Sequence, residues 1–294
     1  MISAGSLNFF FFVCLFQMIL FDWFAEGISG SYLLNMMYFT TVICFVLGLL
    51  TQNYSQVDKL WSLLPPVYCT TVLLTSPYHP RIAIMTALTW VWGLRLTYNF
   101  ARKGGYTWAG EDYRWPILRK IINNRILFEI FNLTFISIFQ NLLLLFLVCP
   151  TFYLASHQTG PLNLWDLVCT LAFIFFFLIE VTADQQQWNF HQAKQAGKPS
   201  TKDGFIQNGL FRYSRHPNFF SEICIWWVFY AFTFSVEPLS VFNWTGLGTL
   251  SLTFLINGST SFTESISSDK YPKYKQYQMT TSRLIPWWSS KKSD

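Results

Sequence analysis

The sequence predicts an all-α protein, a polytopic membrane helical bundle of about seven to eight transmembrane helices. Hydrophobic residues make up 52% of the 294 residues and charged residues only 12%, whereas about a quarter of a soluble domain is charged. This composition excludes a soluble nucleic-acid-binding module, a disordered chain and a disulfide-stapled secreted domain. Eight apolar runs are long enough to cross a bilayer, which takes about 17 to 25 residues: 7–25, 32–51, 57–76, 81–101, 126–149, 164–182, 219–235 and 241–258.

Two of these runs differ from a simple span. The first has no basic segment and no small-residue cleavage site, so we expect a retained span and not a signal peptide. Asp58 and Lys59 lie at the start of the third, and Pro65 and Pro66 interrupt it. Because carbonyl groups freed by proline need partners at membrane depth, we expect this segment inside the bundle or close to the membrane surface.

Lysine and arginine are distributed unevenly between the connections. They gather after the fourth and sixth runs and in the C-terminal tail. The opposite connections, 26–31, 77–80, 150–163 and 236–240, contain none. Since these residues concentrate on the cytosolic side, both termini and the long loops are expected to be cytosolic. Anchoring to lipid headgroups is an alternative explanation for some of them.

Cysteine and histidine show no metal-binding pattern. The six cysteines lie inside or at the end of apolar runs without a C-x-x-C pair, and the four histidines are scattered without an H-E-x-x-H motif. Zinc sites need such clusters, so we predict no metal site. We interpret the cysteines as small core residues.

Polar residues gather at the end of the sixth run, in the segment 180–194. Helical spacing places Glu180, Asp184, Trp188 and His191 on one face. Ionisable groups at membrane depth cost a few kcal/mol each, so such a cluster indicates a functional site. The alternative is a polar helix end that marks the membrane interface.

The densest polar cluster is 209-GLFRYSRHPNFFSE-222. Gly209 is expected in a turn that returns the chain to the membrane, and Pro217 in the first turn of a helix. Arg212, Arg215 and a histidine then lie close to the free amides of that helix. This combination favours a phosphate or another anion. A purely structural anchor is the alternative.

These segments resemble the membrane-embedded steroid 5-alpha-reductase-like proteins, in particular a branch described as a domain of unknown function with a steroid-dehydrogenase-type C-terminal half. The resemblance covers most of the chain from about residue 56 onward. It is carried by Val57, Asp58, Trp61, Trp92, Arg95, Leu96, Glu111–Arg114, Glu180, Asp184, the segment 209–222 and the segment 271-YPKYKQYQMTTSRLIPW-287.

The resemblance implies a reductase that uses NADPH to reduce an activated carbon–carbon double bond of a lipid or sterol-like substrate in the endoplasmic reticulum membrane. It divides the chain into an N-terminal transmembrane hairpin, residues 1–55, and a reductase-like domain with cytosolic cofactor-binding loops, residues 56–294. The partners that the resemblance implies are the lipid substrate and the membrane, with no nucleic acid. The implied cofactor-binding residues are Asp184, Arg212, Arg215, His216, Asn218, Glu222, Glu264 and Tyr274.

Three positions depart from the pattern of the family. Phe219 replaces a tyrosine and Ser221 a glycine, and Ile266 stands near the place of an arginine. The first change removes a phenol beside the expected cofactor, and the last removes one phosphate contact. Neither removes the expected anion pocket.

A reduction of this kind also needs a proton donor. A tyrosine keeps its proton at neutral pH because its pKa is about 10, so the implied catalytic residues are Tyr98 and Tyr113, with Glu111 beside the latter. Two alternatives stay open. One is an S-adenosylmethionine-dependent methyltransferase acting on a lipid or a prenylated cysteine, because such enzymes carry a similar Arg-His-Pro element. The other is a non-enzymatic protein that keeps the fold.

Overall fold

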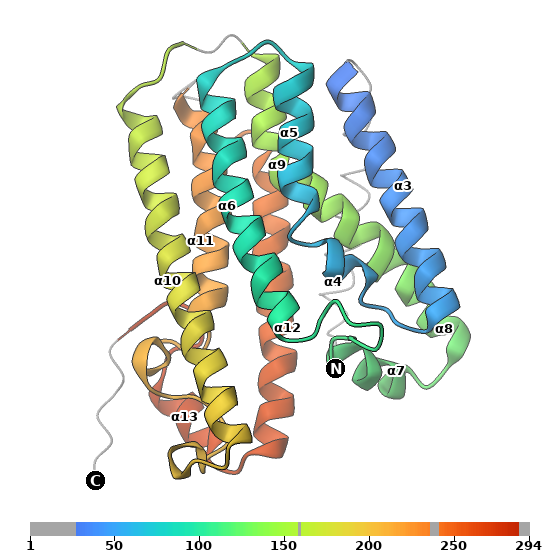
Figure 1. Cartoon of the computed structure of the whole chain (residues 1–294), viewed down its shortest axis with the longest axis vertical. Coiled ribbons are helices and arrows are strands. Elements are labelled where there is room, and N and C mark those ends of the chain that lie inside the picture. Colours follow the sequence, from blue (N-terminus) through green and yellow to red (C-terminus); the bar gives the residue numbers. More distant parts are fainter. Residues whose placement is uncertain (1–27, 158–159, 236–240, 288–294) are drawn as a thin grey trace. The chain divides into compact units, whose positions relative to one another are not determined.

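The computed structural model describes residues 28–157, 160–235 and 241–287, and every regular element in these ranges is a helix (Figure 1). The all-α prediction is therefore confirmed for this part of the chain. The chain divides into two compact units. The first comprises Met1–Asp166 and Phe232–Ser251, and the second comprises Leu167–Ala231 and Leu252–Asp294.

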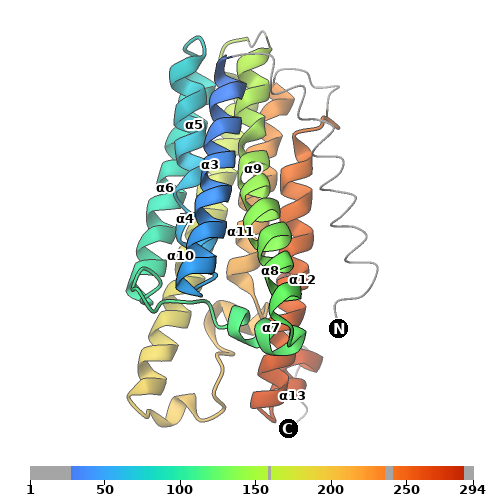
Figure 2. The same ribbon diagram turned by 90° about the vertical axis from the view of Figure 1, so that its right-hand side faces the viewer.

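Helix α9 (Gln140–Ser156) is the core of the first unit, because every side chain from Gln140 to Leu154 is buried. Its sequence is apolar on all sides, as expected of a helix that other helices surround. Helices α3 (Ile28–Thr51), α5 (Leu64–Thr75) and α6 (Pro80–Arg102) pack against it. Figures 1 and 2 both show these four helices side by side.

The prolines of the third apolar run begin a helix instead of bending one. A short helix, α4 (Gln56–Leu60), ends before them, and Pro65 and Pro66 occupy the first turn of α5. Proline fits there because the first amides of a helix have no partner within it. Both prolines are buried, and α5 packs against α3, α6 and α9. The segment thus lies inside the bundle, as expected.

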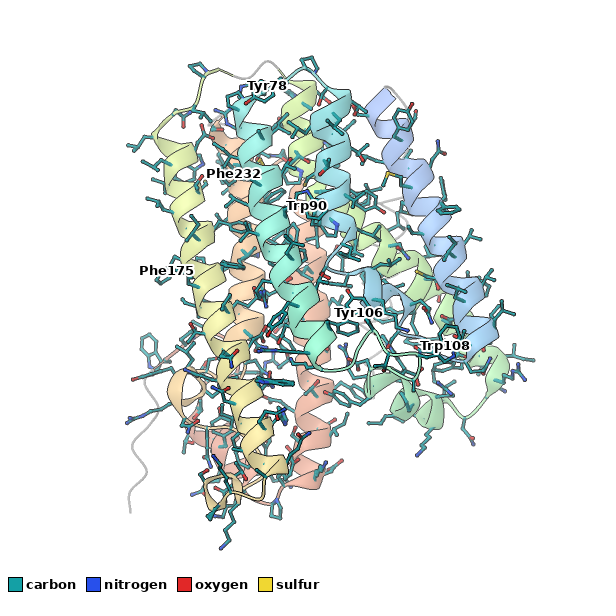
Figure 3. The ribbon with its side chains drawn as sticks, viewed as in Figure 1. Tyr78, Trp90, Tyr106, Trp108, Phe175 and Phe232 are labelled. Carbon is teal, nitrogen blue, oxygen red and sulfur yellow. The ribbon has the colours of Figure 1, made fainter. Side chains whose placement is uncertain are left out.

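Helix α6 is attached to its neighbours through specific contacts. Pro80 is its first residue, and the Nδ1 atom of His79 accepts a hydrogen bond from the Arg81 amide at 3.1 Å. The indole of Trp90 donates to Thr70 Oγ1 on α5 at 2.9 Å, and Figure 3 shows Trp90 on this helix. At the α6 N-terminus the buried Arg81 side chain forms an ion pair with Asp166.

The remaining elements of the first unit are short helices and the first part of a helix that continues into the second unit. Helices α7 (Arg114–Ile122) and α8 (Arg125–Phe131) follow α6, and the π-helix η1 (Asn132–Phe139) joins α8 to α9. The 3-10 helix η4 (Phe232–Ser235) packs against α9. The first turns of α12 (Gly246–Lys270) also belong to this unit.

The second unit contains most of α10 (Leu164–Gln195), the later part of α12, and four shorter elements: η2 (Pro199–Thr201), η3 (Gly209–Arg212), α11 (Pro217–Ala231) and α13 (Tyr274–Thr280). Phe173 on α10 and Ile225, Trp226 and Phe229 on α11 are buried. Phe205, in the loop between η2 and η3, stacks on the ring of Tyr277 with 5.4 Å between centroids.

Three helical segments among the described residues are long and apolar enough to cross a membrane: Ser29–Thr51, Arg125–Ser156 and Leu164–Gln195. They coincide with the predicted spans 32–51, 126–149 and 164–182. The predicted spans 57–76, 81–101, 219–235 and 241–258 fall on helices that do not meet the same criterion, and α5 is a shorter apolar helix. The predicted span 7–25, and with it half of the predicted N-terminal hairpin, lies outside the described residues.

Candidate functional site

The turn before α11 depends on Gly209. Its φ angle is +61°, a conformation that residues with a side chain rarely adopt. A Cβ atom at this position would also collide with the side chain of Gln186, whose Oε1 atom accepts a hydrogen bond from the Leu210 amide at 2.9 Å. The helix then begins at Pro217. Both features agree with the sequence-based expectation of a turn at Gly209 and a helix start at Pro217.

Glu264 on α12 holds this turn through a group of residues that we call the Glu264 cluster: Arg215, His216, Glu264, Gln278 and Thr281. Arg215 donates from Nε to Glu264 Oε1 at 2.7 Å and from Nη2 to Oε2 at 3.0 Å. His216 Nε2 lies 2.9 Å from Oε1, and Gln278 Nε2 donates to Oε2 at 3.0 Å. One carboxylate therefore joins three segments that are distant in the sequence.

The C-terminal segment is bound to the same turn through its backbone. Arg215 Nη1 donates to the carbonyl oxygens of Gln278, at 2.9 Å, and Thr281. The Arg215 amide donates to Ser282 O at 2.8 Å. A guanidinium group has five N–H groups, and these contacts together with Glu264 use four of them. The fifth N–H of the Arg215 guanidinium takes part in none of these contacts.

The charge of Glu264 is strongly stabilised. Its side chain is only 7% exposed, and burial by itself would raise its pKa. The hydrogen bonds from His216, Arg215 and Gln278 and the positive charge of Arg215 outweigh burial, so the pKa of Glu264 falls from 4.5 to about 2. The cluster therefore contains a carboxylate at any physiological pH.

A second polar contact joins α10 to the start of α11. Asn218 donates from Nδ2 to Asp184 Oδ1 at 3.2 Å. One turn further along α11, the buried Glu222 accepts a hydrogen bond from Trp226 Nε1 at 3.0 Å. Carboxylates beside a side-chain amide can accept from hydroxyl groups and amides of a ligand. The structure thus places Asp184, Asn218 and Glu222, all predicted from the sequence, in the second unit with the Glu264 cluster.

The last two predicted cofactor-binding residues have different environments. Arg212, at the end of η3, is exposed. Tyr274 is buried, and its ring lies against Phe205 with 5.0 Å between centroids. The neighbouring Tyr277 donates a hydrogen bond to the carbonyl of Phe211 and so attaches η3 to α13. Tyr274 contributes to this aromatic core.

Two of the three residues that depart from the family pattern make specific local contacts. The ring of Phe219 stacks on His216, with 5.4 Å between centroids and 7° between planes. Ser221 is buried, and its hydroxyl donates to Pro217 O at 2.9 Å. Phe219 thus holds the imidazole in place by stacking, without the hydroxyl of a tyrosine.

The three residues predicted to be catalytic lie in the first unit. Tyr98 on α6 is 66% exposed, and the Arg102 guanidinium lies 5.5 Å from the centroid of its ring. Tyr113 is 50% exposed and directly precedes α7. Glu111 is instead part of a polar network: its carboxylate contacts Arg119 Nη2 at 3.1 Å and accepts from the Tyr54 amide at 2.9 Å.

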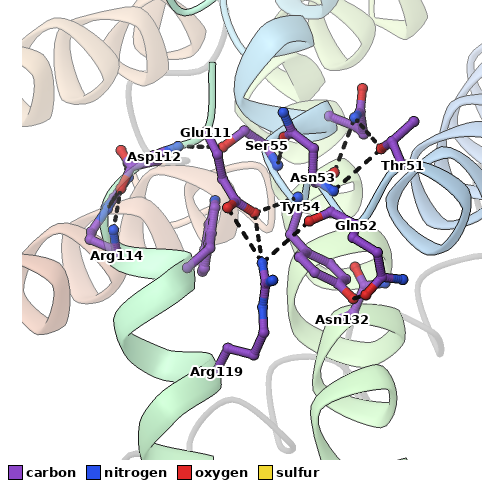
Figure 4. A network of polar contacts seen from close by, with 12 residues as sticks. Thr51, Gln52, Asn53, Tyr54, Ser55, Glu111, Asp112, Arg114, Arg119 and Asn132 are labelled. Atoms are coloured by element: carbon purple, nitrogen blue, oxygen red, sulfur yellow. Dashed lines mark hydrogen bonds and ion pairs between the residues drawn. The ribbon is translucent and has the colours of Figure 1, made fainter. Parts of the chain in front are cut away.

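Figure 4 shows this polar network between residues 51–55 and the start of α7. Asn53 donates to the carbonyls of Trp108 and Gly110, and the Asp112 amide donates to Ser55 Oγ at 2.8 Å. The Tyr54 hydroxyl donates to Glu129 Oε1 at 2.6 Å. Burial and this hydrogen bond raise the pKa of Tyr54 well above its ordinary value. The network fixes the loop that carries Tyr113.

Sequence reasoning missed several of these residues. Arg119 lies in a basic segment and Glu129 in an apolar run, and neither segment contains a recognisable motif. Gln278 is a neutral residue in a C-terminal segment whose tyrosines are its distinguishing feature. The pairing of Glu111 with Arg119 needs the turn at 112–114, which sequence spacing does not define. In the described ranges no three metal-binding side chains gather in one place.

A family model with the description "Protein of unknown function (DUF1295)" matches residues 44–281. The chain belongs to the DUF1295 family. A relative, the uncharacterized protein C594.04c of Schizosaccharomyces pombe, is 39% identical over 255 aligned residues, which cover 80% of this chain and 73% of the relative. No solved structure matches the chain. The DUF1295 match includes the whole Glu264 cluster and the Asp184–Asn218 pair.

Proposed function

We propose that this DUF1295 protein is a membrane-embedded, NADPH-dependent oxidoreductase of the steroid 5-alpha-reductase-like type, which reduces an activated carbon–carbon double bond of a lipid or sterol-like substrate. The proposal rests on one observation above all. Arg215, His216 and Glu264 were each predicted from the sequence as cofactor-binding residues, and they contact one another in the Glu264 cluster. The Asp184–Asn218 contact in the same unit adds to it.

The proposal includes the membrane arrangement that the sequence predicts: about seven to eight spans, both termini in the cytosol and a location in the endoplasmic reticulum. The three apolar helices support a membrane protein. A glycosylation site appended to the C-terminus tests the orientation, because a modified C-terminus would contradict a cytosolic one.

The residues of the second unit suit the chemical groups of NADPH. Exposed Arg212 and the remaining N–H of Arg215 would hold phosphate oxygens. Asp184 would accept from a ribose hydroxyl, and His216, Asn218 and Glu222 would surround the nicotinamide. When bound, NADPH supplies a hydride. The rigid hydrogen bonds of Glu264 keep Arg215 and His216 oriented before any ligand arrives, which reduces the entropy lost on binding.

The proton donor of the proposed reaction belongs to the first unit. Tyr98 and Tyr113 are the proposed donors, because a phenol hydroxyl can serve as a general acid. The ion pair of Glu111 with Arg119 makes Glu111 a residue that positions the loop next to Tyr113. We therefore propose that Glu111 acts on the reaction through that loop.

A methyltransferase that uses S-adenosylmethionine is the second proposal, and one observation favours it. Arg215 directs four of its five N–H groups to protein atoms, so the cluster offers little free positive charge for phosphate. S-adenosylmethionine has no phosphate and suits carboxylates and amides. The exposed Arg212 favours NADPH over this alternative.

Ligand-induced stabilisation separates the two proposals. Purified protein in detergent is heated with NADPH or with S-adenosylmethionine, since a ligand that binds the folded state raises the melting temperature. Stabilisation by NADPH alone supports the reductase, and stabilisation by S-adenosylmethionine alone supports the methyltransferase. Stabilisation by neither would favour a non-enzymatic protein that keeps the fold.

Two arginine variants then test the phosphate contacts. Arg212→Ala and Arg215→Ala are each expected to weaken NADPH binding by about an order of magnitude or more, as the loss of a charge-assisted hydrogen bond predicts. Lys275→Ala is the matched control, because Lys275 is an exposed base on α13 outside the cluster. Unchanged affinity in either arginine variant would remove that residue from the binding site.

A further inference from the structure

One exposed face of α10 changes its chemistry abruptly. Its exposed side chains recur every three to four residues, so they form one continuous stripe along the helix. The stripe is apolar as far as Leu178, which is 56% exposed, and polar from Thr182 onward. Figure 3 shows Phe175 pointing outward from the apolar part. The apolar members are Leu167, Leu171, Phe175 and Leu178, and the polar members are Thr182, Gln185, Asn189 and Gln192.

Helix α12 shows the same change on its own exposed face. Phe254 is 44% exposed and is the last apolar side chain of this face in the second unit. The exposed residues that follow at helical spacing are Gly258, Ser261, Ser265 and Asp269. Two helices of the second unit therefore pass from an apolar to a polar exposed surface.

Contacts with α11 place the two changes at the same height. The Asp184–Asn218 contact puts these residues level with each other, and the change on α10 lies about 6 Å from Asp184 at a rise of about 1.5 Å per residue. Trp227 Nε1 donates to Thr253 Oγ1 at 3.1 Å. Trp227 lies about 14 Å from Asn218 along the axis of α11. The change on α12 lies about 5 Å from Thr253, in the direction that leads back towards the level of Asn218.

The change on α12 is therefore about 9 Å from the level of Asn218, and that on α10 about 6 Å. A difference of about 3 Å corresponds to two helical residues. The same level crosses α11 between Glu222 and Cys224. Trp227, which is 39% exposed, lies about one helical turn away on the apolar side of this level. Tryptophan is enriched at membrane interfaces.

We propose that the acyl boundary of a lipid bilayer crosses the second unit at this level, between Leu178 and Thr182 on α10 and between Phe254 and Gly258 on α12. Lipid tails then cover the apolar stripe, and water surrounds the polar continuation of both helices. The span of α10 supports the proposal. From Leu164 to residue 180, the middle of the change, the helix rises about 24 Å, which corresponds to a transmembrane helix of about 17 residues, the lower end of the usual range.

This boundary places the Glu264 cluster in water. Glu264 lies about 12 Å beyond the change on α12, whereas a headgroup layer is about 5 to 7 Å thick. The Asp184–Asn218 pair lies at the outer edge of that layer. A ligand of the cluster is therefore water-soluble. If the proposed function holds, the atoms of the lipid substrate that react at this site are those next to its polar end.

Spin labels along the stripe test the boundary. Single cysteines replace Leu171, Phe175, Leu178, Thr182, Gln185 and Asn189 in full-length protein in phosphatidylcholine nanodiscs, with the unsubstituted protein as the labelling background. Oxygen concentrates in the acyl region, and a nickel chelate stays in water. We expect collisions with oxygen to dominate up to position 178 and collisions with the nickel chelate to dominate from position 182 or 185.

Three results would overturn the proposal. The order of the two collision rates could fail to invert along α10, or it could invert more than one turn away from 178–182. Labels at 171–178 could also be shielded from both reagents, which would show that another protein covers the stripe. None of these results depends on NADPH binding, so failure of the boundary and failure of the proposed function are distinguishable.

Hydroxyl-radical footprinting of the unsubstituted protein provides a second measurement that needs no variant. Radicals generated in water oxidise exposed side chains, and lipid tails protect them. We expect protection of Phe175, Leu178 and Phe254 in nanodiscs and oxidation of His191 and Met279, both exposed in the structure. Oxidation of Leu178 to the same extent as His191 would contradict the boundary.

Discussion

Arg81 and Asp166, which are 85 residues apart in the sequence, form a two-pronged ion pair in the first unit. Nε contacts Oδ1 at 2.6 Å, and Nη2 contacts Oδ2 at 2.9 Å. The two side chains are 0% and 3% exposed. The pair therefore attaches the start of α6 to the start of α10 in a place where water does not screen the charges.

Removing one member of this pair is expected to destabilise the protein strongly. Asp166→Asn keeps the size of the side chain but leaves the charge of Arg81 buried without a counterion. Loss of one partner of a buried pair costs about 3 to 5 kcal/mol. The measurement is the free energy of unfolding in detergent, by denaturant or heat.

The double variant Arg81→Met, Asp166→Leu is the control. It removes both charges, so no unpaired charge is left in the interior. We expect it to be more stable than Asp166→Asn, because apolar replacements of a buried pair are often neutral. A single variant as stable as the wild type would show that the pair contributes little.

Local features of the site followed from the sequence, and its pairings did not. Gly209 and Pro217 were predictable because turn and helix-start chemistry depends on neighbours in the chain. Arg215 and Glu264 were both predicted to contact a cofactor, but their contact with each other depends on how α12 and α11 pack. The same holds for Asp166, which no motif distinguished. Three of the predicted spans fall on helices that are long and apolar enough to cross a membrane, whereas the division of residues 56–76 into α4 and α5 needed the tertiary contacts of the prolines.

The pKa of Glu264 predicts a pH dependence of stability. Its pKa is about 2 in the folded protein, below its ordinary value of 4.5. A carboxyl group whose pKa is lowered by folding contributes its whole stabilisation at pH values above its pKa in the unfolded chain. This stabilisation is lost as the pH falls from about 4.5 towards 2. Glu264→Gln should therefore melt well below the wild type at pH 7, and the difference should shrink at pH 3.

Asp203→Asn is the matched control for Glu264→Gln. Asp203 forms an ion pair with Lys273 at 2.8 Å, but the two side chains are 28% and 64% exposed. Exposed pairs contribute about 0 to 1 kcal/mol, so this variant should melt close to the wild type at both pH values. A pH-independent deficit in Glu264→Gln would mean that its role is packing and not charge.

Variants at Glu111 distinguish its ion pair from its hydrogen bond. Glu111→Gln loses the charge that faces Arg119 but keeps an oxygen that accepts from the Tyr54 amide. It should cost about 1 kcal/mol or less, since the pair is partly exposed. Glu111→Ala leaves that amide without its acceptor and should cost about 1 to 3 kcal/mol. Equal losses in the two unfolding experiments would contradict a role for the hydrogen bond.

Two glycines of α12 give opposite expectations for the same substitution. A Cβ atom at Gly248 would collide with the backbone of Phe146 and Leu147 on α9, whereas a Cβ atom at Gly258 would meet nothing within 4 Å. Backbone atoms cannot rotate away as a side chain can, so Gly248→Ala must separate the two helices and should cost about 1 to 3 kcal/mol. Gly258→Ala should be neutral or stabilise by up to about 1 kcal/mol through helix propensity. Thermal unfolding of both variants compares them directly, and a Gly248→Ala protein as stable as Gly258→Ala would show that α12 does not pack this closely on α9.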